Sequence, residues 1–263
     1  MNASLQQKMR SYYTRYYRDE CCLPNWQKNV EARLLEEEDE LVKMKELEHL
    51  LGTSFNGQKH CIIGAGTGGL AVVLKQHFDV DVYGVEPSDE EFDIILDRAR
   101  EAGIPEDHFH KIGGEHTPFE NNFFDVIHCF TVLEHVQDVQ QCLDEMLRII
   151  KPGCKVYINT PNYAYPYERH YKIPFPTFLP KVFGKLYLLA LRKSPAFLNT
   201  VNYITEKSIN KMLIGKSGFV WFRLYRTKQK NTGFLSGFFN YLLFSRFVYS
   251  NQEIILLKNE STK

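Results

Sequence analysis

A glycine-rich turn follows the first strongly apolar run of the chain, at residues 64–69, and reads Gly-Ala-Gly-Thr-Gly-Gly. The run before it, residues 60–63, is short and strand-like, and the run after it, residues 70–78, is helix-like. A strand that turns so abruptly into a helix needs glycine, because a Cβ would collide with the backbone nearby or with a ligand. The helix that begins there also presents N–H groups that its own turns do not use. The turn therefore predicts a strand-turn-helix unit with a ligand site beside it.

Strand-like and helix-like segments alternate from residue 59 to residue 157, which is typical of βαβ units and a parallel sheet. We therefore expect an α/β fold with a Rossmann-like doubly wound sheet, mostly parallel with an antiparallel C-terminal strand, and helices on both faces. The third helix of this region should stop where Lys151, Pro152 and Gly153 break it. The expected strands are 59–63, 81–85, 108–112, 124–130, 154–159, 219–226 and 252–258, and the expected helices are 68–78, 88–102, 138–150 and 205–217.

The chain divides into two parts by composition. Residues 1–52 are rich in charge and in helix formers, and they predict an N-terminal helical extension. We interpret its acidic run, residues 36–40, as the solvated face of a helix. Residues 53–263 form the main domain. Within it, residues 161–200 carry many prolines and aromatics without a regular period, which indicates a lid inserted over the sheet.

Charge and composition argue against several classes of protein. Lys and Arg together number 32, as do Asp and Glu, so the chain has no overall field to recruit nucleic acid or an anionic membrane. The sequence also shows no basic stripe with interleaved aromatics, which argues against RNA as a substrate. It shows neither a signal peptide nor an apolar span of about 18 residues, so we expect a cytoplasmic protein. The six cysteines form no C-x-x-C pair, and we expect reduced thiols and no zinc site.

The glycine turn has two interpretations. Gly64, Gly66 and Gly69 satisfy the G-x-G-x-x-G pattern of dinucleotide sites. Gly64, Gly66 and Gly68 satisfy the G-x-G-x-G pattern of adenosylmethionine sites. A second apolar run ends in Glu86, about 20 residues further on, where an acidic side chain can accept hydrogen bonds from ribose hydroxyls. The alternative role of Glu86 is to cap the helix that follows it.

Four blocks of sequence occur together between residues 59 and 162. They are the glycine turn, GVEPS at 84–88, TPFENNFFDVIHCFTVLEHV at 117–136 and LRIIKPGCKVYINTPN at 147–162. With them the chain resembles the class I methyltransferases, and within these the group that includes the ubiquinone-biosynthesis O-methyltransferases. The resemblance implies a methyltransferase that uses S-adenosyl-L-methionine. The residues that it assigns to the cofactor are Gly64, Ala65, Gly66, Gly68, Glu86, Pro87, Phe130 and Thr131.

Two positions depart from the family's pattern. Relatives usually carry an acidic residue two places before the first glycine, facing the methionine end of the cofactor, and this chain has Ile62. Relatives also often have Asp-Ala before the block at residue 117, in contact with the adenine, and this chain has Gly113 and Gly114. Glu115 is next to them, and we expect it to take over that contact.

His135, with Glu134 before it, is the candidate catalytic residue. Methyl transfer mainly requires that the acceptor be aligned and water excluded, but an oxygen acceptor also benefits from a base that removes its proton. A histidine suits this role near neutral pH. The alternative is a histidine that belongs to the core or caps a helix.

A divalent cation is a second alternative for these residues. Some relatives, among them ubiquinone-pathway and small-RNA 2′-O-methyltransferases, bind one through an E-x-x-E-H motif, whose last two residues match Glu134 and His135. His170 would be a further ligand by the same resemblance. The first glutamate of the motif corresponds to Thr131, so a carboxylate is missing and we do not favour a metal site.

The acceptor should be framed by residues 161–200, because family members share the cofactor half and vary the lid. This segment loosely resembles the lid of bacterial methyltransferases of cell-envelope glycan and glycolipid pathways, which implies a small-molecule or lipid-linked acceptor. Residues 178–193 and the aromatic run 234–249 resemble an interfacial membrane anchor in composition, and they are equally suited to pack as a buried lid. We therefore expect either peripheral contact with a membrane or a closed lid over a soluble acceptor. The oligomeric state is left open.

Two other functions stay open. Tyr203 and Lys207 form a Y-x-x-x-K pair, as in short-chain dehydrogenases, which would suit a nicotinamide oxidoreductase. Those enzymes space the glycine turn differently, and Thr205 inside the pair is expected to start a helix. The other alternative is a non-catalytic protein that keeps the cofactor fold, motivated by Ile62 and Gly113.

Overall fold

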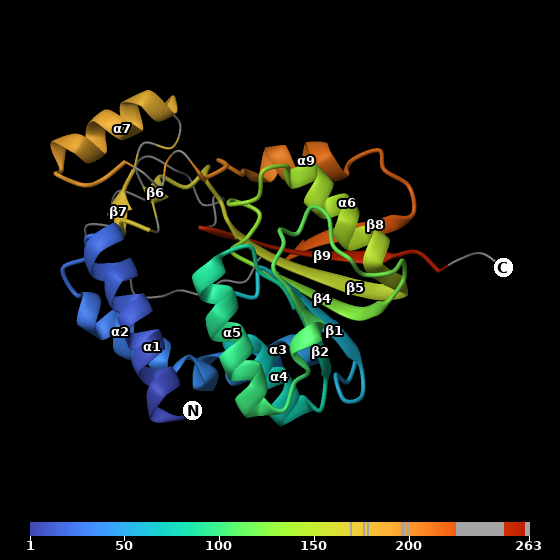
Figure 1. Ribbon diagram of the computed structural model, residues 1–263. Coiled ribbons are helices and arrows are strands. Elements are labelled where there is room, and N and C mark those ends of the chain that lie inside the picture. Colours follow the sequence, from blue (N-terminus) through green and yellow to red (C-terminus); the bar gives the residue numbers. More distant parts are fainter. Residues whose placement is uncertain are drawn as a thin grey trace.

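The computed structural model describes residues 1–168, 170–175, 177, 179–195, 198, 200–224 and 250–260. Its centre is a seven-stranded sheet with the order β3-β2-β1-β4-β5-β9-β8 (Figure 1). Strands β1 to β5 run parallel, and β9 pairs antiparallel with both β5 and β8. The strands are β1 (Lys59–Ile63), β2 (Asp81–Val85), β3 (Phe109–His110), β4 (Phe124–Phe130), β5 (Ile150–Pro161), β8 (Phe219–Leu224) and β9 (Asn251–Lys258).

Helices cover both faces of the sheet. Helices α3, α4 and α5 pack on one face, and α6 and α9 pack on the other. In β1, Cys61 and Ile63 join the core on the α6 side while Ile62 joins the core on the α4 side, and all three are buried. Because successive side chains point to opposite faces, a central strand covered on both sides must be apolar throughout. The helices are α3 (Glu36–Leu51), α4 (Gly69–Phe78), α5 (Asp89–Ala102), α6 (Val139–Ile149) and α9 (Glu206–Leu213).

The expected fold class is confirmed, with differences in the bounds of two strands. β3 is shorter than expected and lies at the edge of the sheet. β5 is longer, because residues 151–153 belong to it and do not form a break before it. Its pairing with β4 shifts register between Phe124 and Val126, so Pro152, which has no N–H to donate, lies in the irregular part of the ladder.

The N-terminal helices pack in two places. α1, the π-helical turn after it and α2 form one cluster, which also contacts α5 through Ile94. α3 instead contributes Met44, Leu47 and Leu51 to the core against the sheet. The division of the chain at residue 52 stays a prediction, since α3 packs with the elements that follow it. The bounds are α1 (Ala3–Thr14), the π-helical turn (Arg15–Glu20) and α2 (Trp26–Leu34).

The segment after β5, which we expected to be a lid and call the lid below, contains one hairpin and one helix. β6 pairs antiparallel with β7, and α7 packs its buried side against Phe175 and Leu198. Figure 1 shows α7 at the outer edge of the molecule, with the hairpin between it and α1. No helix in the described part of the chain is long and apolar enough to cross a bilayer. The aromatic run 234–249 lies outside the described residues. The bounds are β6 (Tyr167–Glu168), β7 (Ile173–Pro174) and α7 (Lys181–Ala190).

Candidate active site

The glycine turn lies at the point where the strand order of the sheet reverses, because β1 has β2 on one side and β4 on the other. In open α/β sheets ligands bind at the carboxyl ends of the strands at such a point. Gly64, Gly66 and Gly68 have positive φ angles of 67°, 56° and 85°. A Cβ on Gly64 would lie 2.3 Å from Val132 Cγ2, and one on Gly68 would lie 2.6 Å from Ile95 Cγ1. A Cβ on Gly66 would meet nothing closer than 4.0 Å, so Gly66 is where a ligand can approach the backbone.

Glu86 follows β2 and turns its carboxylate back onto the glycine turn. Its Oε2 accepts a hydrogen bond from the Gly66 N–H at 2.8 Å, and its Oε1 accepts one from the Ser88 N–H at 2.9 Å. Burial of the side chain, together with the charge of Glu91, raises the pKa of Glu86 to about 7. The Ser88 side chain caps α5, while Glu86 binds the N–H of Ser88 itself, just outside the helix. Each carboxylate oxygen keeps a lone pair for a further donor such as a ribose hydroxyl, so the site fits the ribose of an adenosyl cofactor.

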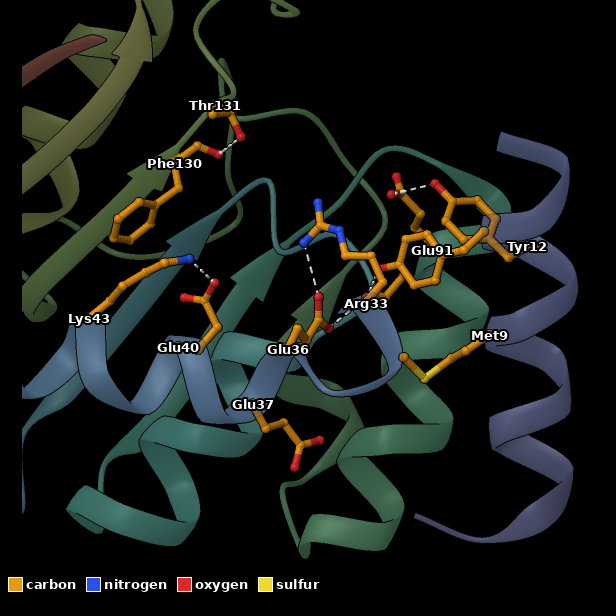
Figure 2. Close-up of polar contacts among 12 residues, drawn as sticks. Met9, Tyr12, Arg33, Glu36, Glu37, Glu40, Lys43, Glu91, Phe130 and Thr131 are labelled. Atoms are coloured by element: carbon orange, nitrogen blue, oxygen red, sulfur yellow. Dashed lines mark hydrogen bonds and ion pairs between the residues drawn. The ribbon is translucent and has the colours of Figure 1, made fainter. Parts of the chain in front are cut away.

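Helix α1 reaches the same site with two tyrosines that the sequence did not reveal. Tyr12 Oη donates to Glu91 Oε1 at 2.6 Å, and Tyr13 Oη lies 2.7 Å from Thr67 Oγ1 in the glycine turn. Figure 2 shows Tyr12 directed from α1 toward Glu91 on α5. Tyr13 and Thr67 are 54 residues apart, and no local pattern marks either as a partner of the other.

A buried carboxylate from α3 occupies the amino end of α4, directly after the glycine turn. Glu36 Oε1 accepts a 2.7 Å bond from Arg98 Nη1. Its Oε2 accepts a 3.0 Å bond from Arg33 Nη1, and Figure 2 shows Arg33 directed toward Glu36. A Cβ on Gly69, the first residue of α4, would lie 2.3 Å from Glu36 Oε1. Dinucleotide sites place the pyrophosphate at this end of the helix. Because a protein anion already lies there, the geometry disfavours a dinucleotide.

The interpretation of residues 36–40 as a solvated face is therefore wrong for Glu36, which is 7 % exposed. The signal that could have corrected it is Arg98, which belongs to the same buried face of α5 as Ile94, Ile95 and Ala99. An arginine within an apolar stripe requires a buried acidic partner.

β4 ends at Phe130, and Thr131 follows in a strained conformation. Thr131 has a φ of 55°, which a β-branched residue rarely adopts. Its N–H donates to the Asn159 carbonyl at 2.7 Å, and its hydroxyl donates to the Phe130 carbonyl at 2.7 Å. Backbone strain of this kind concentrates at ligand sites, which agrees with a role near the cofactor. Contacts of Phe130 and Thr131 with the cofactor stay predictions, as do those of the buried Ala65 and the exposed Pro87.

The two departures from the family's pattern have local causes. Ile62 is 3 % exposed and belongs to the core against α4. A Cβ on Gly114 would lie 2.5 Å from Ile63 Cγ2, and one on Gly113 would lie 2.4 Å from Glu115 Oε2. Glu115 Oε1 accepts a 2.6 Å bond from the N–H of residue 137 in the loop after β4. The glycines thus make room for their neighbours, and an adenine contact of Glu115 is untested.

Glu134 and His135 follow β4 and differ in their surroundings. Glu134 is 1 % exposed, and its Oε2 accepts a 3.0 Å bond from Thr160 Oγ1 at the end of β5. His135 is exposed to solvent, yet the protein close around its ring lowers its pKa to about 4, chiefly through lost hydration and next through the charge of His170. The buried Glu134 therefore ties the loop after β4 to the end of β5, while His135 is accessible to a ligand.

The lid brings a second histidine to His135. The ring centroids of His135 and His170 lie 5.2 Å apart, with an interplanar angle of 75°. His170 Nδ1 in turn lies 2.7 Å from Glu168 Oε1. Within the described ranges no group of three or more His, Cys, Asp or Glu side chains is arranged to hold a metal ion, and the six cysteines are free thiols.

Tyr203 and Lys207 do not share a helix. Thr205 caps α9 between them, since its side chain accepts a 3.1 Å bond from the Ser208 N–H. Tyr203 precedes the helix and stacks on Tyr163, with ring centroids 4.9 Å apart. The expectation that a helix starts at Thr205 is confirmed, and the pair lacks the helical spacing that a dehydrogenase would need.

Known proteins match the central part of the chain. A family model described as a methyltransferase domain matches residues 62–158. The ubiquinone biosynthesis O-methyltransferase of Pectobacterium atrosepticum is 29% identical over 106 residues, which are 40% of this chain and 44% of that protein. Norajmaline N-methyltransferase of Rauvolfia serpentina is 29% identical over 97 residues, which are 36% of this chain and 33% of that protein. The chain thus spans less than half the length of these curated relatives.

Solved structures share the fold over most of the chain. A putative S-adenosylmethionine-dependent methyltransferase from Methanococcus maripaludis has a TM-score of 0.54 at 17% identity and covers 88% of this chain and 90% of its own. A methyltransferase from Thermotoga maritima, described as a possible histamine N-methyltransferase, has a TM-score of 0.50 at 18% identity and covers 97% and 98%. At these identities the likeness concerns the fold alone. The matched segment carries the glycine turn and the strand-end carboxylate together, and so residues 62–158 are similar to the methyltransferase domain that the sequence predicted.

Proposed function

We propose that the chain transfers a methyl group from S-adenosyl-L-methionine to an oxygen atom of a small-molecule or lipid-linked acceptor. The observation that carries the proposal is the hydrogen bond from the Gly66 N–H to the Glu86 carboxylate, at the point where the strand order of the sheet reverses. A Cβ on Gly66 would meet nothing closer than 4.0 Å, so a ligand can approach the backbone there, and the buried carboxylate offers acceptors for ribose hydroxyls. The glycine turn, Glu86 and the residues at the end of β4 would hold the cofactor.

The chain's own contribution to methyl transfer is alignment and the exclusion of water. The bound cofactor supplies a methyl carbon already activated by a positive sulfur. Tyr12 and Tyr13 fasten α1 to the glycine turn and to α5, which closes that side of the site. The hairpin of the lid, which carries His170 to His135, closes the other side.

His135 orients the acceptor in this proposal. Its lowered pKa of about 4 makes it neutral at physiological pH, so one ring nitrogen can accept a hydrogen bond from an acceptor hydroxyl. The same low pKa makes it a weak proton acceptor, because general-base catalysis is most effective when the pKa of the base lies near the working pH. We therefore assign His135 to positioning and not to proton removal.

The class of acceptor rests on the relatives and on the lid. The curated relatives are named for ubiquinone biosynthesis and for norajmaline, which favours a small-molecule acceptor. Helix α7 carries exposed Val182, Phe183 and Leu186, which favours an acceptor presented at a lipid surface. A lipid-linked acceptor would satisfy both observations, and we propose that the protein meets it in the cytoplasm at the inner face of a membrane.

A nicotinamide oxidoreductase and a non-catalytic cofactor-binding protein are the competing functions. Titration calorimetry of the full chain with adenosylmethionine, adenosylhomocysteine, NADH and NADPH distinguishes a methyltransferase from a nicotinamide oxidoreductase. We expect the two adenosyl compounds to bind and the nicotinamide compounds not to bind, because Glu36 takes the place of a pyrophosphate. Tighter binding of NADH or NADPH would overturn the proposal. Tight cofactor binding without release of adenosylhomocysteine from any hydroxyl acceptor would favour the non-catalytic protein.

A further inference from the structure

The hairpin of the lid carries a glutamate and a histidine to which the proposed function gives no role in the chemical step. Glu168, the last residue of β6, is fully buried, with 0 % of its surface exposed. Its Oε1 lies 2.7 Å from His170 Nδ1, and its Oε2 accepts a 2.9 Å bond from the Tyr171 N–H. Both carboxylate oxygens are therefore held, and they fix the orientation of the His170 ring.

The contact with Glu168 decides which nitrogen of His170 carries a proton. An ionised carboxylate only accepts hydrogen bonds, so His170 Nδ1 must be the donor. In the neutral ring Nε2 then bears the lone pair, and Nε2 is the nitrogen that can take up a proton. The geometry thus gives His170 a defined tautomer with its basic nitrogen on the side away from Glu168.

Groups from other elements also lie close enough to Glu168 to feel its negative charge. Cys21, at the end of the π-helical turn, and Tyr203, before α9, both have a raised pKa, chiefly through burial and also through the charge of Glu168. In the described part of the chain, the Glu168 carboxylate lies 2.7 Å from His170 Nδ1, and this contact becomes an ion pair only when the ring is protonated. A buried carboxylate in this position stabilises a positive charge on the neighbouring ring.

His135 faces the pair from the loop after β4. Its ring lies 5.2 Å from that of His170, and the charge of His170 is, after burial, a cause of the low pKa of His135. The two rings therefore disfavour being protonated together. Of the two rings, His170 is the one in direct contact with the Glu168 carboxylate.

We propose that His170 is the proton acceptor of the methyl-transfer reaction and that Glu168 is the residue that positions it, an inference that rests on the proposed function. The O–H bond of the acceptor breaks, and its proton passes to His170 Nε2. The electron pair of that oxygen forms the new bond to the methyl carbon, and the electrons of the carbon–sulfur bond stay on sulfur. The positive charge that begins on sulfur ends on the His170 imidazolium, beside Glu168.

A first experiment requires no acceptor. In the full chain labelled with ¹⁵N-histidine, nuclear magnetic resonance reports which ring nitrogen is protonated, and the His170 signals are assigned by their loss in His170→Asn. We expect a proton on Nδ1 and none on Nε2 at a pH where the ring is neutral. Glu168→Gln, which keeps the shape and removes the charge, should convert part of the ring to the other tautomer. A native protein with the proton on Nε2 would overturn the inference whatever its turnover.

A second experiment measures release of adenosylhomocysteine from adenosylmethionine with a panel of phenols and sugar hydroxyl compounds. His170→Asn should lower kcat about 100-fold or more, the effect of losing a general base, without weakening adenosylhomocysteine binding more than about twofold. Glu168→Gln should lower kcat, because the imidazolium that forms during the reaction loses its counter-charge. The exposed His116 provides the matched control, since His116→Asn should change neither quantity.

The outcomes separate the two proposals. Native kcat in His170→Asn would refute the role of His170 and leave the proposed function standing. Normal cofactor binding with no turnover on any acceptor would refute the proposed function, and this inference with it. If Glu168→Gln fails to fold, His170→Asn and the tautomer of the native protein still decide.

Discussion

The ionisation of one buried side chain, Glu86, should govern cofactor binding. Its pKa is raised to about 7, first by burial and then by Glu91. Only the ionised form can accept hydrogen bonds with both oxygens while it keeps those from Gly66 and Ser88. Affinity for adenosylhomocysteine should therefore rise as the pH increases from 6 to 8, by about tenfold, and level off above. Calorimetry at a series of pH values measures this rise.

The role of Glu91 in that pH dependence can be tested separately. Glu91→Gln removes a negative charge that disfavours ionisation of Glu86, so the rise in affinity should move to lower pH. Asp89→Asn, an exposed change in the same first turn of α5, is the matched control and should leave the curve in place. An affinity that is constant from pH 6 to pH 8 in the native protein would show that Glu86 does not bind the ribose.

Removal of the Glu86 carboxylate should weaken the site itself. Glu86→Ala should reduce adenosylhomocysteine affinity by about 1.5–3 kcal/mol, the range for a hydrogen bond to a charged group, or roughly 10- to 150-fold. Glu90→Ala, on the exposed side of α5 in an ion pair with Arg15, should leave the affinity near native. Equal affinities in the two variants would contradict the assignment of Glu86.

Sequence predicts a site residue when the residue's role depends on its neighbours in the chain. Gly64 and Glu86 each follow a strand directly, and Gly66 lies two residues after Gly64, so the ends of β1 and β2 fix their positions. Glu36 and Glu168 could not be found in this way. The partner of Glu36 is Arg98, 62 residues away. The role of Glu168 depends on the contact between His170 in the lid and His135 in the loop after β4, which no local pattern reveals.

At the scale of elements, Arg98 joins α5 to α3 through Glu36. The Arg98 side chain is 3% exposed and that of Glu36 is 9%. Loss of one partner leaves a buried charge poorly compensated, which costs about 3–5 kcal/mol. Arg98→Ala should therefore lower the free energy of unfolding by about 3 kcal/mol, measured by urea titration with circular dichroism. Arg100→Ala, whose side chain is 60% exposed, should lower it by less than about 1 kcal/mol, and similar effects of the two would refute this account.

Elements with a regular apolar period were predicted almost to the residue, and elements that depend on distant pairing were not. Helices α4 and α5 begin one residue after the expected bounds of 68 and 88. β5 starts at Ile150 because β4 offers it a partner there, which overrides the local tendency of Pro152 and Gly153 to break structure. The hairpin β6–β7 has strands of two residues, too short for any period to appear in the sequence.

At the scale of the whole molecule, an overall charge of zero conceals a segregation of charge. Between Glu168 and Glu206 the sequence has six Lys or Arg residues and no acidic residue, whereas residues 36–40 are all acidic. The chain as a whole thus has no net charge to recruit an anionic membrane, but the lid segment taken by itself is basic. A basic lid on a neutral protein would orient the molecule at a negatively charged surface.

Helix α7 adds an apolar face to this basic lid. Val182, Phe183, Leu186 and Leu189 are 56%, 52%, 57% and 56% exposed, and they share one side of the helix. The opposite side of α7 packs into the lid. An exposed apolar row with lysines beside it is the pattern of a helix that lies in a membrane interface. We therefore predict that α7 holds the protein at the surface of an anionic bilayer.

Co-sedimentation with vesicles decides this prediction. The full chain should sediment with vesicles that contain phosphatidylglycerol at low salt, and less with purely zwitterionic vesicles, because each lysine near an anionic surface contributes about 1 kcal/mol. The double variant Phe183→Ser, Leu186→Ser should bind at least about tenfold more weakly, since each buried CH₂ contributes about 0.8 kcal/mol. Ile214→Ser changes a residue outside the lid that is 67% exposed, and it should bind like the native protein. A native protein that stays in the supernatant would exclude membrane docking by α7 and would favour a small soluble acceptor beneath a closed lid.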